Sequence, residues 1–192
     1  EIRRLLTQSV HRRLMSDVPL GLFLSGGIDS SAAAVAMKEL LPTNETKAFA
    51  VGFSERSFDE SAYARLVADH LGFGLDIQRL EMAEAEALAP DILRGLDEPM
   101  ADASLLPTYL LSRFTRQSVT VALSGDGGDE LFAGYDPFMA LTPAAIYHAL
   151  VPRPMHQLFR CLADLLPVSS KNMSLDFKLR RTLQGLDYGP EL

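Results

Sequence analysis

One stretch, Val18-Pro-Leu-Gly-Leu-Phe-Leu-Ser-Gly-Gly-Ile-Asp-Ser-Ser31, decides the fold. Its first half, residues 18–24, is a short apolar run that predicts a buried strand. Residues 25–27 predict a tight turn. The small and apolar side chains of residues 28–41 then predict a packed helix that Pro42 closes. A strand, a glycine turn and a helix therefore follow one another without a break.

The same alternation repeats further along the chain. Ser57 and Glu60 have capping-box spacing ahead of a helix that ends near residue 71. Gly72 and Gly74 then lead into another strand. The expected strands are 18–24, 46–53, 75–80 and 118–123, and two further helices are expected over 83–96 and 104–117. Strands separated by helices predict an α/β fold with a doubly wound parallel sheet covered on both faces.

The two ends of the chain have helical patterns of their own. Apolar residues at helical spacing predict an amphipathic helix over residues 1–15, with its arginines on the solvated face. After Tyr135, prolines interrupt helical patches such as 144–150 and 155–166. We therefore expect one domain over residues 1–140 and a C-terminal helical extension of the same domain, incomplete, over 141–192.

Composition excludes several classes of protein. The chain has 192 residues, 47% apolar and 22% charged, and its 25 acidic and 18 basic residues give a net charge of −7. This balance argues against nucleic acid as a partner, because backbone phosphates require a basic face. The longest unbroken apolar run, residues 32–37, is far shorter than the ~20 residues that span a bilayer. We expect neither a nucleic-acid nor a membrane partner.

Cysteine and histidine usage indicates neither a disulfide nor a metal cluster. Cys161 is the only cysteine, so an intramolecular disulfide is excluded and a reducing, cytoplasmic setting is expected. Cys161 itself is expected to be a small packed residue. The histidines lack metal-ligand spacing and are expected to be structural or exposed. They are His11, His70, His148 and His156.

The first glycine loop has the composition of an anion-binding site. Gly26 and Gly27 allow backbone N–H groups to approach an anion, and the helix that follows adds partial positive charge. The loop lacks the lysine of a Walker motif. Asp29 would repel a phosphate unless a cation intervenes, which favours Mg²⁺. The alternative is that Ser25 and Asp29 only cap the helix.

The second glycine loop, Ser124-Gly-Asp-Gly-Gly-Asp-Glu130, ends the last expected strand. Its three carboxylates would repel one another unless a metal or cationic group is bound. The alternative is a solvated turn. Because ligands of an open parallel sheet lie beyond the carboxyl ends of its strands, the two loops are expected to share one crevice. Asp29 and Asp129 would then hold one Mg²⁺ against a nucleotide polyphosphate.

These motifs carry a family resemblance. The Ser25-Gly-Gly-Ile-Asp-Ser30 loop resembles the pyrophosphate loop of the N-type ATP pyrophosphatases, which by itself also admits the NAD, GMP and argininosuccinate synthetases. Combined with Ser124-Gly-Asp-Gly-Gly-Asp-Glu-Leu-Phe-Ala-Gly-Tyr135, it resembles the synthetase domain of glutamine-hydrolysing asparagine synthetases. Segments 48–53, 58–61 and 97–102 also fit, and exopolysaccharide-associated amidotransferases of this family are the closest in motif. The resemblance covers about residues 14–135.

The resemblance implies an adenine nucleotide alpha hydrolase-like fold that binds ATP and Mg²⁺. A carboxylate such as aspartate would attack the α-phosphorus and form an acyl-adenylate with release of pyrophosphate. Ammonia derived from glutamine would then displace AMP and give an amide. By position, the resemblance assigns Asp29 and Asp129 to Mg²⁺. It assigns Leu24, Val51, Ser124 and Gly125 to the nucleotide, and Ser25, Gly26, Gly27, Asp29, Ser30 and Ser31 to its pyrophosphate.

Two departures from the family pattern concern the acceptor chemistry. Asp126 stands where many asparagine synthetases carry a glutamate that positions or deprotonates the attacking nitrogen, and it is one methylene shorter. Residues 101–107 contain no arginine to pair with a substrate carboxylate. The acceptor therefore stays open between aspartate and another, exopolysaccharide-related carboxylate. Another adenylating synthetase and a non-catalytic nucleotide-binding module are the remaining alternatives.

The resemblance also concerns parts outside the sequence. An N-terminal glutaminase domain would precede Glu1, and helices carrying a catalytic lysine would follow Leu192. We therefore expect a piece of a longer protein that binds nucleotide but forms amide poorly by itself. The sequence admits a homodimer without requiring one.

Overall fold

The computed structural model describes residues 1–41, 46–100, 102, 104–167 and 174–187. It forms two compact units, Glu1–Gly127 and Gly128–Leu192. The division into regions 1–140 and 141–192 is a different one and stays a prediction. Within the described ranges, no helix has both the length and the apolar character needed to cross a membrane.

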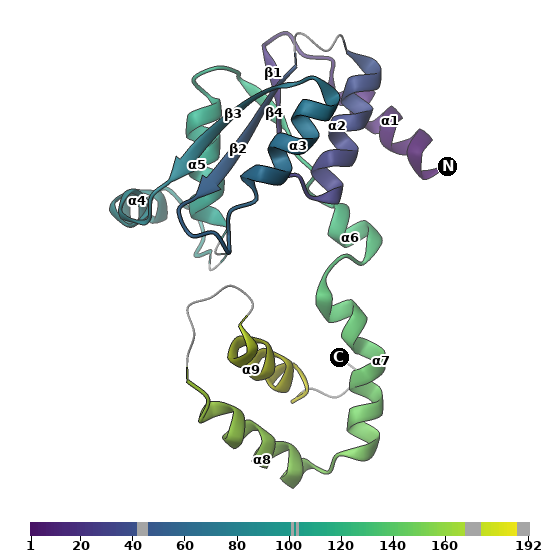
Figure 1. Cartoon of the computed structure of the whole chain (residues 1–192), viewed down its shortest axis with the longest axis vertical. Helices are drawn as coiled ribbons and strands as arrows, with labels where there is room; N and C mark the ends of the chain where they lie inside the picture. Colours follow the sequence, from purple (N-terminus) through teal and green to yellow (C-terminus); the bar gives the residue numbers. More distant parts are fainter. Residues whose placement is uncertain (42–45, 101, 103, 168–173, 188–192) are drawn as a thin grey trace. The chain divides into compact units, whose positions relative to one another are not determined.

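The first unit contains a parallel sheet of four strands, as the sequence predicts. The strands are β1 (Leu20–Phe23), β2 (Lys47–Phe53), β3 (Gly74–Leu80) and β4 (Val121–Leu123). Their order in the sheet is β3-β2-β1-β4. The chain therefore builds outward from β1 on one side and later returns to its other side (Figure 1). In a doubly wound sheet, the crevice where the strand order reverses is the usual ligand site.

Helices cover both faces of this sheet. The helices of the first unit are α1 (Ile2–Arg13), α2 (Ile28–Leu40), α3 (Ser61–Leu71), α4 (Met82–Arg94) and α5 (Leu105–Thr115). Figure 1 shows α2 and α3 on one side of the strands and α5 on the other. Helices on both faces are the arrangement that crossover connections between parallel strands produce.

The side chains of β2 alternate between the two faces. Ala48 and Ala50 join the larger core cluster, which also contains the alanines of α2 and α3. Val51 and Phe53 pack instead around Leu80 and Leu110, in a smaller cluster. The alanines leave little side-chain volume between α2 and β1–β2, so the helix and its N-terminal loop lie close to the sheet.

The start of α3 differs from the prediction. Its N-cap residue, Glu60, makes no side-chain capping hydrogen bond. The expected Ser57–Glu60 capping box is therefore wrong, since the Ser57 hydroxyl donates to Glu55 in the preceding turn. The capping acceptor is Asp59, whose Oδ1 lies 3.1 Å from the Ser61 nitrogen. An aspartate that accepts from the backbone two residues on is a common alternative to the capping box.

The second unit is helical. It consists of α6 (Gly128–Phe132), α7 (Asp136–Leu150), α8 (Arg153–Asp164) and α9 (Leu175–Gly185). Pro137 and Pro154 lie in the first turns of α7 and α8, where their missing N–H groups cost nothing. Pro143 lies inside α7, which nevertheless continues to Leu150, so the expected interruption at this proline is not found. Cys161 on α8 is exposed, so the prediction of a packed cysteine is wrong.

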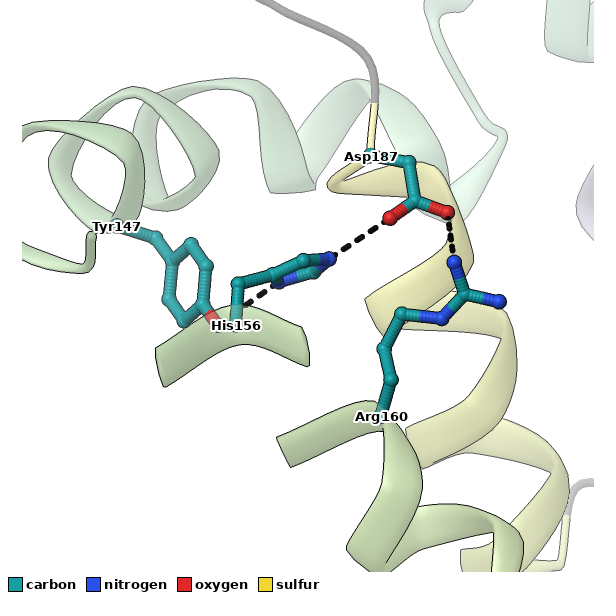
Figure 2. A network of polar contacts seen from close by, with 4 residues as sticks. All are labelled: Tyr147, His156, Arg160 and Asp187. Carbon is teal, nitrogen blue, oxygen red and sulfur yellow. Dashed lines mark hydrogen bonds and ion pairs between the residues drawn. The ribbon is translucent and has the colours of Figure 1, made fainter. Parts of the chain in front are cut away.

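Polar side chains join three segments of the second unit. His156 of α8, which is 9% exposed, lies between Tyr147 of α7 and Asp187 after α9 (Figure 2). Its Nδ1 is 3.1 Å from the Tyr147 hydroxyl, and its Nε2 is 2.8 Å from Asp187 Oδ1. Arg160 contacts the other Asp187 oxygen. His156 is thus a structural residue, as expected for the histidines.

The contacts of Asp187 make its contribution to stability depend on pH. The hydrogen bond from His156, together with Arg160, holds the pKa of the Asp187 carboxyl below its ordinary value. The ionised carboxylate therefore stabilises the folded unit above the ordinary aspartate pKa. That contribution is lost as the pH falls through the lowered pKa.

Replacing His156 tests this network. His156→Phe keeps a planar ring in the buried position but leaves the Tyr147 hydroxyl and Asp187 Oδ1 without their partner. We expect the free energy of unfolding of the second unit to fall by about 1–3 kcal/mol. The control is His148→Phe, one residue after Tyr147, which should change it by less than about 0.5 kcal/mol. Equal thermal denaturation curves for both variants would contradict the assignment.

Candidate functional site

The first glycine loop continues directly from β1. Leu24 is 1% exposed, and its N–H donates to the Phe49 carbonyl over 2.9 Å, which extends the sheet beyond the strand end. Gly26 then adopts a left-handed conformation with φ +85°. Gly27 is extended and forms the N-cap of α2. The loop therefore turns the chain sharply into α2. As in any α-helix, the first N–H groups of α2 lack partners within the helix.

Serine hydroxyls hold this loop in shape. Ser25 Oγ accepts from the Gly27 N–H at 3.1 Å and lies 3.0 Å from Ser30 Oγ. The Ser30 hydroxyl also lies 3.2 Å from the Gly27 carbonyl oxygen, to which it can donate. Ser31 Oγ is buried without a hydrogen-bond partner among the described residues. The hydroxyls of Ser25 and Ser30 are hydrogen-bonded within the loop and that of Ser31 is buried, so the donors left for an anion are mainly backbone N–H groups.

The second glycine loop lies directly against the first turn of α2. A Cβ atom at Gly125 would lie 2.5 Å from the Ser30 nitrogen and 2.8 Å from the Asp29 carbonyl carbon. This contact is made between two backbones, because β1 and β4 are neighbours and their following loops leave the same edge of the sheet. The structure therefore brings the two loops together, as the topology predicts.

The other predicted site residues differ in whether their side chains or their backbone atoms are exposed. Ser124 donates to Asp126 Oδ2 at 2.8 Å, which orients an otherwise exposed carboxylate. The side chains of Leu24 and Val51 lie in the two core clusters. Near these two residues, a nucleotide base would therefore meet backbone atoms.

The Asp29 carboxylate is suited to a cation. It is partly exposed in the first turn of α2, and within the described part of the chain no group donates a hydrogen bond to it. An ionised carboxylate has only acceptor oxygens, which are the ligands that Mg²⁺ prefers. No three or more His, Cys, Asp or Glu side chains gather as a metal site among the described residues. A cation at Asp29 would take most of its ligands from a nucleotide and water.

A hydrogen bond closes the turn that follows α6 in the second unit. Ala133, after α6, has φ 54°, the only positive value found for a non-glycine residue in the described ranges. This conformation costs about 1–2 kcal/mol and folds the chain back, so that the Gly134 N–H donates to the Asp129 carbonyl at 2.9 Å. A Cβ at Gly134 would lie 2.0 Å from Asp129 Oδ1. Gly134 thus leaves room for the Asp129 carboxylate.

Glu130 is held at the same turn by an aromatic hydroxyl. Tyr135 donates a hydrogen bond to its carboxylate, which holds the pKa of Glu130 below its ordinary value. Of the three acids in this loop, Asp126 accepts a hydrogen bond from Ser124 and Glu130 from Tyr135, whereas Asp129 has space beside Gly134. These partners were not predicted from the sequence, although Gly134, shortly after the acidic residues, is a typical helix-end residue.

The close contact between the loops can be tested at Gly125. Gly125→Ala introduces a methyl group against the α2 backbone, so one of the loops must move. We expect the free energy of unfolding of the first unit to fall by about 1–3 kcal/mol. Gly74→Ala is the control, because a Cβ there meets nothing within 4 Å. Equal stability of the two variants in thermal denaturation would show that the loops are not in backbone contact.

Comparison with known proteins connects this site to a family. A sequence profile described as asparagine synthase matches residues 1–187. The chain is 37% identical over 168 residues to a putative glutamine-hydrolyzing asparagine synthetase 2 of Methanocaldococcus jannaschii, covering 88% of this chain and 32% of that relative. It is 35% identical over 178 residues to the glutamine-hydrolyzing asparagine synthetase 1 of Bacillus subtilis, covering 91% and 27%. The chain thus spans about three tenths of the length of these relatives.

The likeness extends to a solved structure, at the level of the fold. The glutamine-dependent NAD⁺ synthetase of Acinetobacter baumannii, in complex with ADP, superposes with a TM-score of 0.52 at 21% identity. The match covers 70% of this chain and 27% of that one. The sheet order, the two converging loops and the sequence matches agree with one another. The chain belongs to the asparagine synthase family.

Proposed function

We propose that this chain is the ATP-cleaving part of a glutamine-hydrolysing, asparagine synthetase-like enzyme. The observation that carries the proposal is the backbone contact between the two glycine loops at the Gly125–Ser30 position. This contact lies at the edge of the sheet where β1 and β4 end. A phosphate ester bound there would meet the N–H groups and partial positive charge of the α2 N-terminus.

Two sets of residues of the chain would hold ATP, one at its pyrophosphate and one at its adenine. The first turn of α2, with Gly26 and Gly27, would hold the leaving pyrophosphate. The hydroxyls of Ser25 and Ser30 would hold the loop in its conformation. Backbone atoms around Leu24, Val51 and Gly125 would hold the adenine. A carboxylate would attack the α-phosphorus, form an acyl-adenylate and release pyrophosphate. Developing charge on the pyrophosphate is stabilised by preorganised N–H donors.

Amide formation would follow from attack by ammonia on the acyl carbon, with AMP as the leaving group. Asp126 is the candidate to accept a proton from the attacking nitrogen, and Ser124 orients its carboxylate at 2.8 Å. Glutamine would supply the ammonia through a glutaminase domain of a longer polypeptide in the cytoplasm. That domain is the proposed macromolecular partner.

Magnesium is the proposed metal. The carboxylates of Asp29 in the first unit and Asp129 in the second fit it, because both offer acceptor oxygens and a helix N-terminus alone would leave Asp29 repelling a phosphate. When bound, Mg²⁺ would neutralise charge on the phosphate oxygens. Gly134 leaves the space that the Asp129 carboxylate occupies.

The acceptor has two candidates. Aspartate is the first, from the family. A different, exopolysaccharide-related carboxylate is the second, favoured by the absence of arginine from residues 101–107 of the sequence.

Product analysis tests the proposed reaction. The full-length polypeptide is incubated with Mg-ATP and ammonia, with and without aspartate, and AMP, pyrophosphate and asparagine are quantified. We expect aspartate-dependent AMP matched by asparagine. The variant Asp29→Asn should lower AMP formation by at least about tenfold, because the cation loses a charged ligand, while the fold is retained. Release of ADP would overturn the proposal. AMP formation that ignores aspartate would select the other acceptor.

Gly134→Ala tests the proposed metal ligand without removing it. The new methyl group would occupy the space of Asp129 Oδ1, so the carboxylate must rotate away. We expect the Mg²⁺ concentration for half-maximal ATP binding to rise by about tenfold. The methyl group would also lie 3.2 Å from the Asp129 Cα, so we expect a small loss of thermal stability beside the change in Mg²⁺ requirement. Gly185→Ala, in the same unit and with open space around its Cβ, is the control. An unchanged Mg²⁺ requirement would remove Asp129 from the metal site.

A further inference from the structure

The first glycine loop contacts the first turn of α3. A Cβ at Gly26 would lie 2.5 Å from the Ala64 nitrogen, 2.5 Å from the Tyr63 carbonyl carbon and 2.6 Å from Tyr63 Cβ. Ala64 is completely buried in the larger core cluster. Gly26 therefore has no freedom to move toward α3, and its left-handed conformation follows the position of this turn.

One carboxylate oxygen sets where this turn lies. Asp59 Oδ1 accepts from the Ser61 N–H at 3.1 Å, at the start of α3, and from the Phe53 N–H at 3.4 Å, at the end of β2. The same atom thus ties the strand to the helix. Ser61, by its hydroxyl and its N–H, holds the pKa of Asp59 below its ordinary value, so the carboxylate is ionised at neutral pH.

Gly52 gives this carboxylate its space. A Cβ at Gly52 would come to 3.5 Å from Asp59 Oδ1 and 3.6 Å from Ser61 Cβ, and to a tighter 3.3 Å from Ile77 Cγ2. A side chain larger than a methyl group would therefore collide with the carboxylate or with β3. The end of β2, Asp59 and the start of α3 form one packed unit behind the loop.

We propose that Asp59 is a positioning residue for the pyrophosphate of ATP. It touches no reacting atom. By holding the first turn of α3 against Gly26, it keeps the N–H groups at the start of α2, which follow the Ser25–Gly27 loop, directed at the phosphates. This inference rests on the proposed function, since the loop must bind pyrophosphate for its position to matter.

Three substitutions separate geometry from charge. Asp59→Ala removes the accepting oxygen. Asp59→Asn keeps an oxygen in place without the charge, and Asp59→Glu keeps the charge but moves the oxygen by one methylene. Asp69→Ala is the matched control, because it removes an exposed acid from the last turn of the same helix.

The measurement is the dissociation constant of the chain for Mg-pyrophosphate, Mg-ATP and adenosine, by calorimetry, with a melting curve for each variant. We expect Asp59→Ala and Asp59→Glu to raise the constants for Mg-pyrophosphate and Mg-ATP by about tenfold. Asp59→Asn and Asp69→Ala should stay within about threefold of the wild type. Adenosine binding should be unchanged throughout. If Asp59→Ala does not fold, the Asn and Glu variants still carry the comparison.

The outcomes separate the inference from the function on which it rests. Wild-type affinity for Mg-pyrophosphate combined with unchanged affinity in Asp59→Ala or Asp59→Glu would overturn the inference alone. Rescue by Glu but not by Asn would replace positioning with a charge effect, and would overturn it too. A wild-type chain that binds neither Mg-ATP nor Mg-pyrophosphate would overturn the proposed function and the inference together.

Discussion

The first unit depends on one constraint, the contact of the Gly125 backbone with the first turn of α2, where a single added carbon would lie 2.5 Å from a nitrogen. Two loops about a hundred residues apart in sequence can meet this closely only if their strands are neighbours, and β1 and β4 are. The strand order β3-β2-β1-β4 achieves this by returning the chain to the free side of β1. The strand order therefore determines where the two loops meet, and the point where the order reverses is the usual ligand site of a doubly wound sheet.

The size of the side chains on the two faces of the sheet also affects where α2 and its N-terminal loop lie. Alanines of α2 and β2 make up much of the larger core cluster, so the helix packs near the strands and its N-terminus stays beside the loops. The opposite face carries larger side chains, where Phe49 and Phe114 meet edge to face at 6.1 Å between ring centroids. Short side chains therefore lie between α2 and the sheet, and aromatic side chains pack on the α5 face.

The sheet and its two glycine loops could be predicted from the sequence. The start of α3 and the long-range contacts could not, for physical reasons. The strand–turn–helix pattern of residues 18–31 and the glycine loop at Ser124 depend on local residue types, so both were readable. The start of α3 was not, because Ser57–Glu60 and Asp59 offer competing caps and the choice depends on Phe53, which lies in another element. The contact of Gly26 with Tyr63 and Ala64, and the network around His156, join segments distant in sequence. Periodicity carries no information about such pairs.

The hydrogen bonds of the first loop bear on the role proposed for Asp59. The hydroxyls of Ser25 and Ser30 are hydrogen-bonded to one another and to Gly27, so the proposed pyrophosphate would be bound mainly by backbone N–H groups. A side-chain donor can swing to follow a displaced ligand, whereas a backbone donor moves only with its loop. If backbone N–H groups bind the pyrophosphate, the affinity therefore depends on the residues that hold the loop in place. Here the loop is held on one side by Gly125 and on the other by the turn that Asp59 caps.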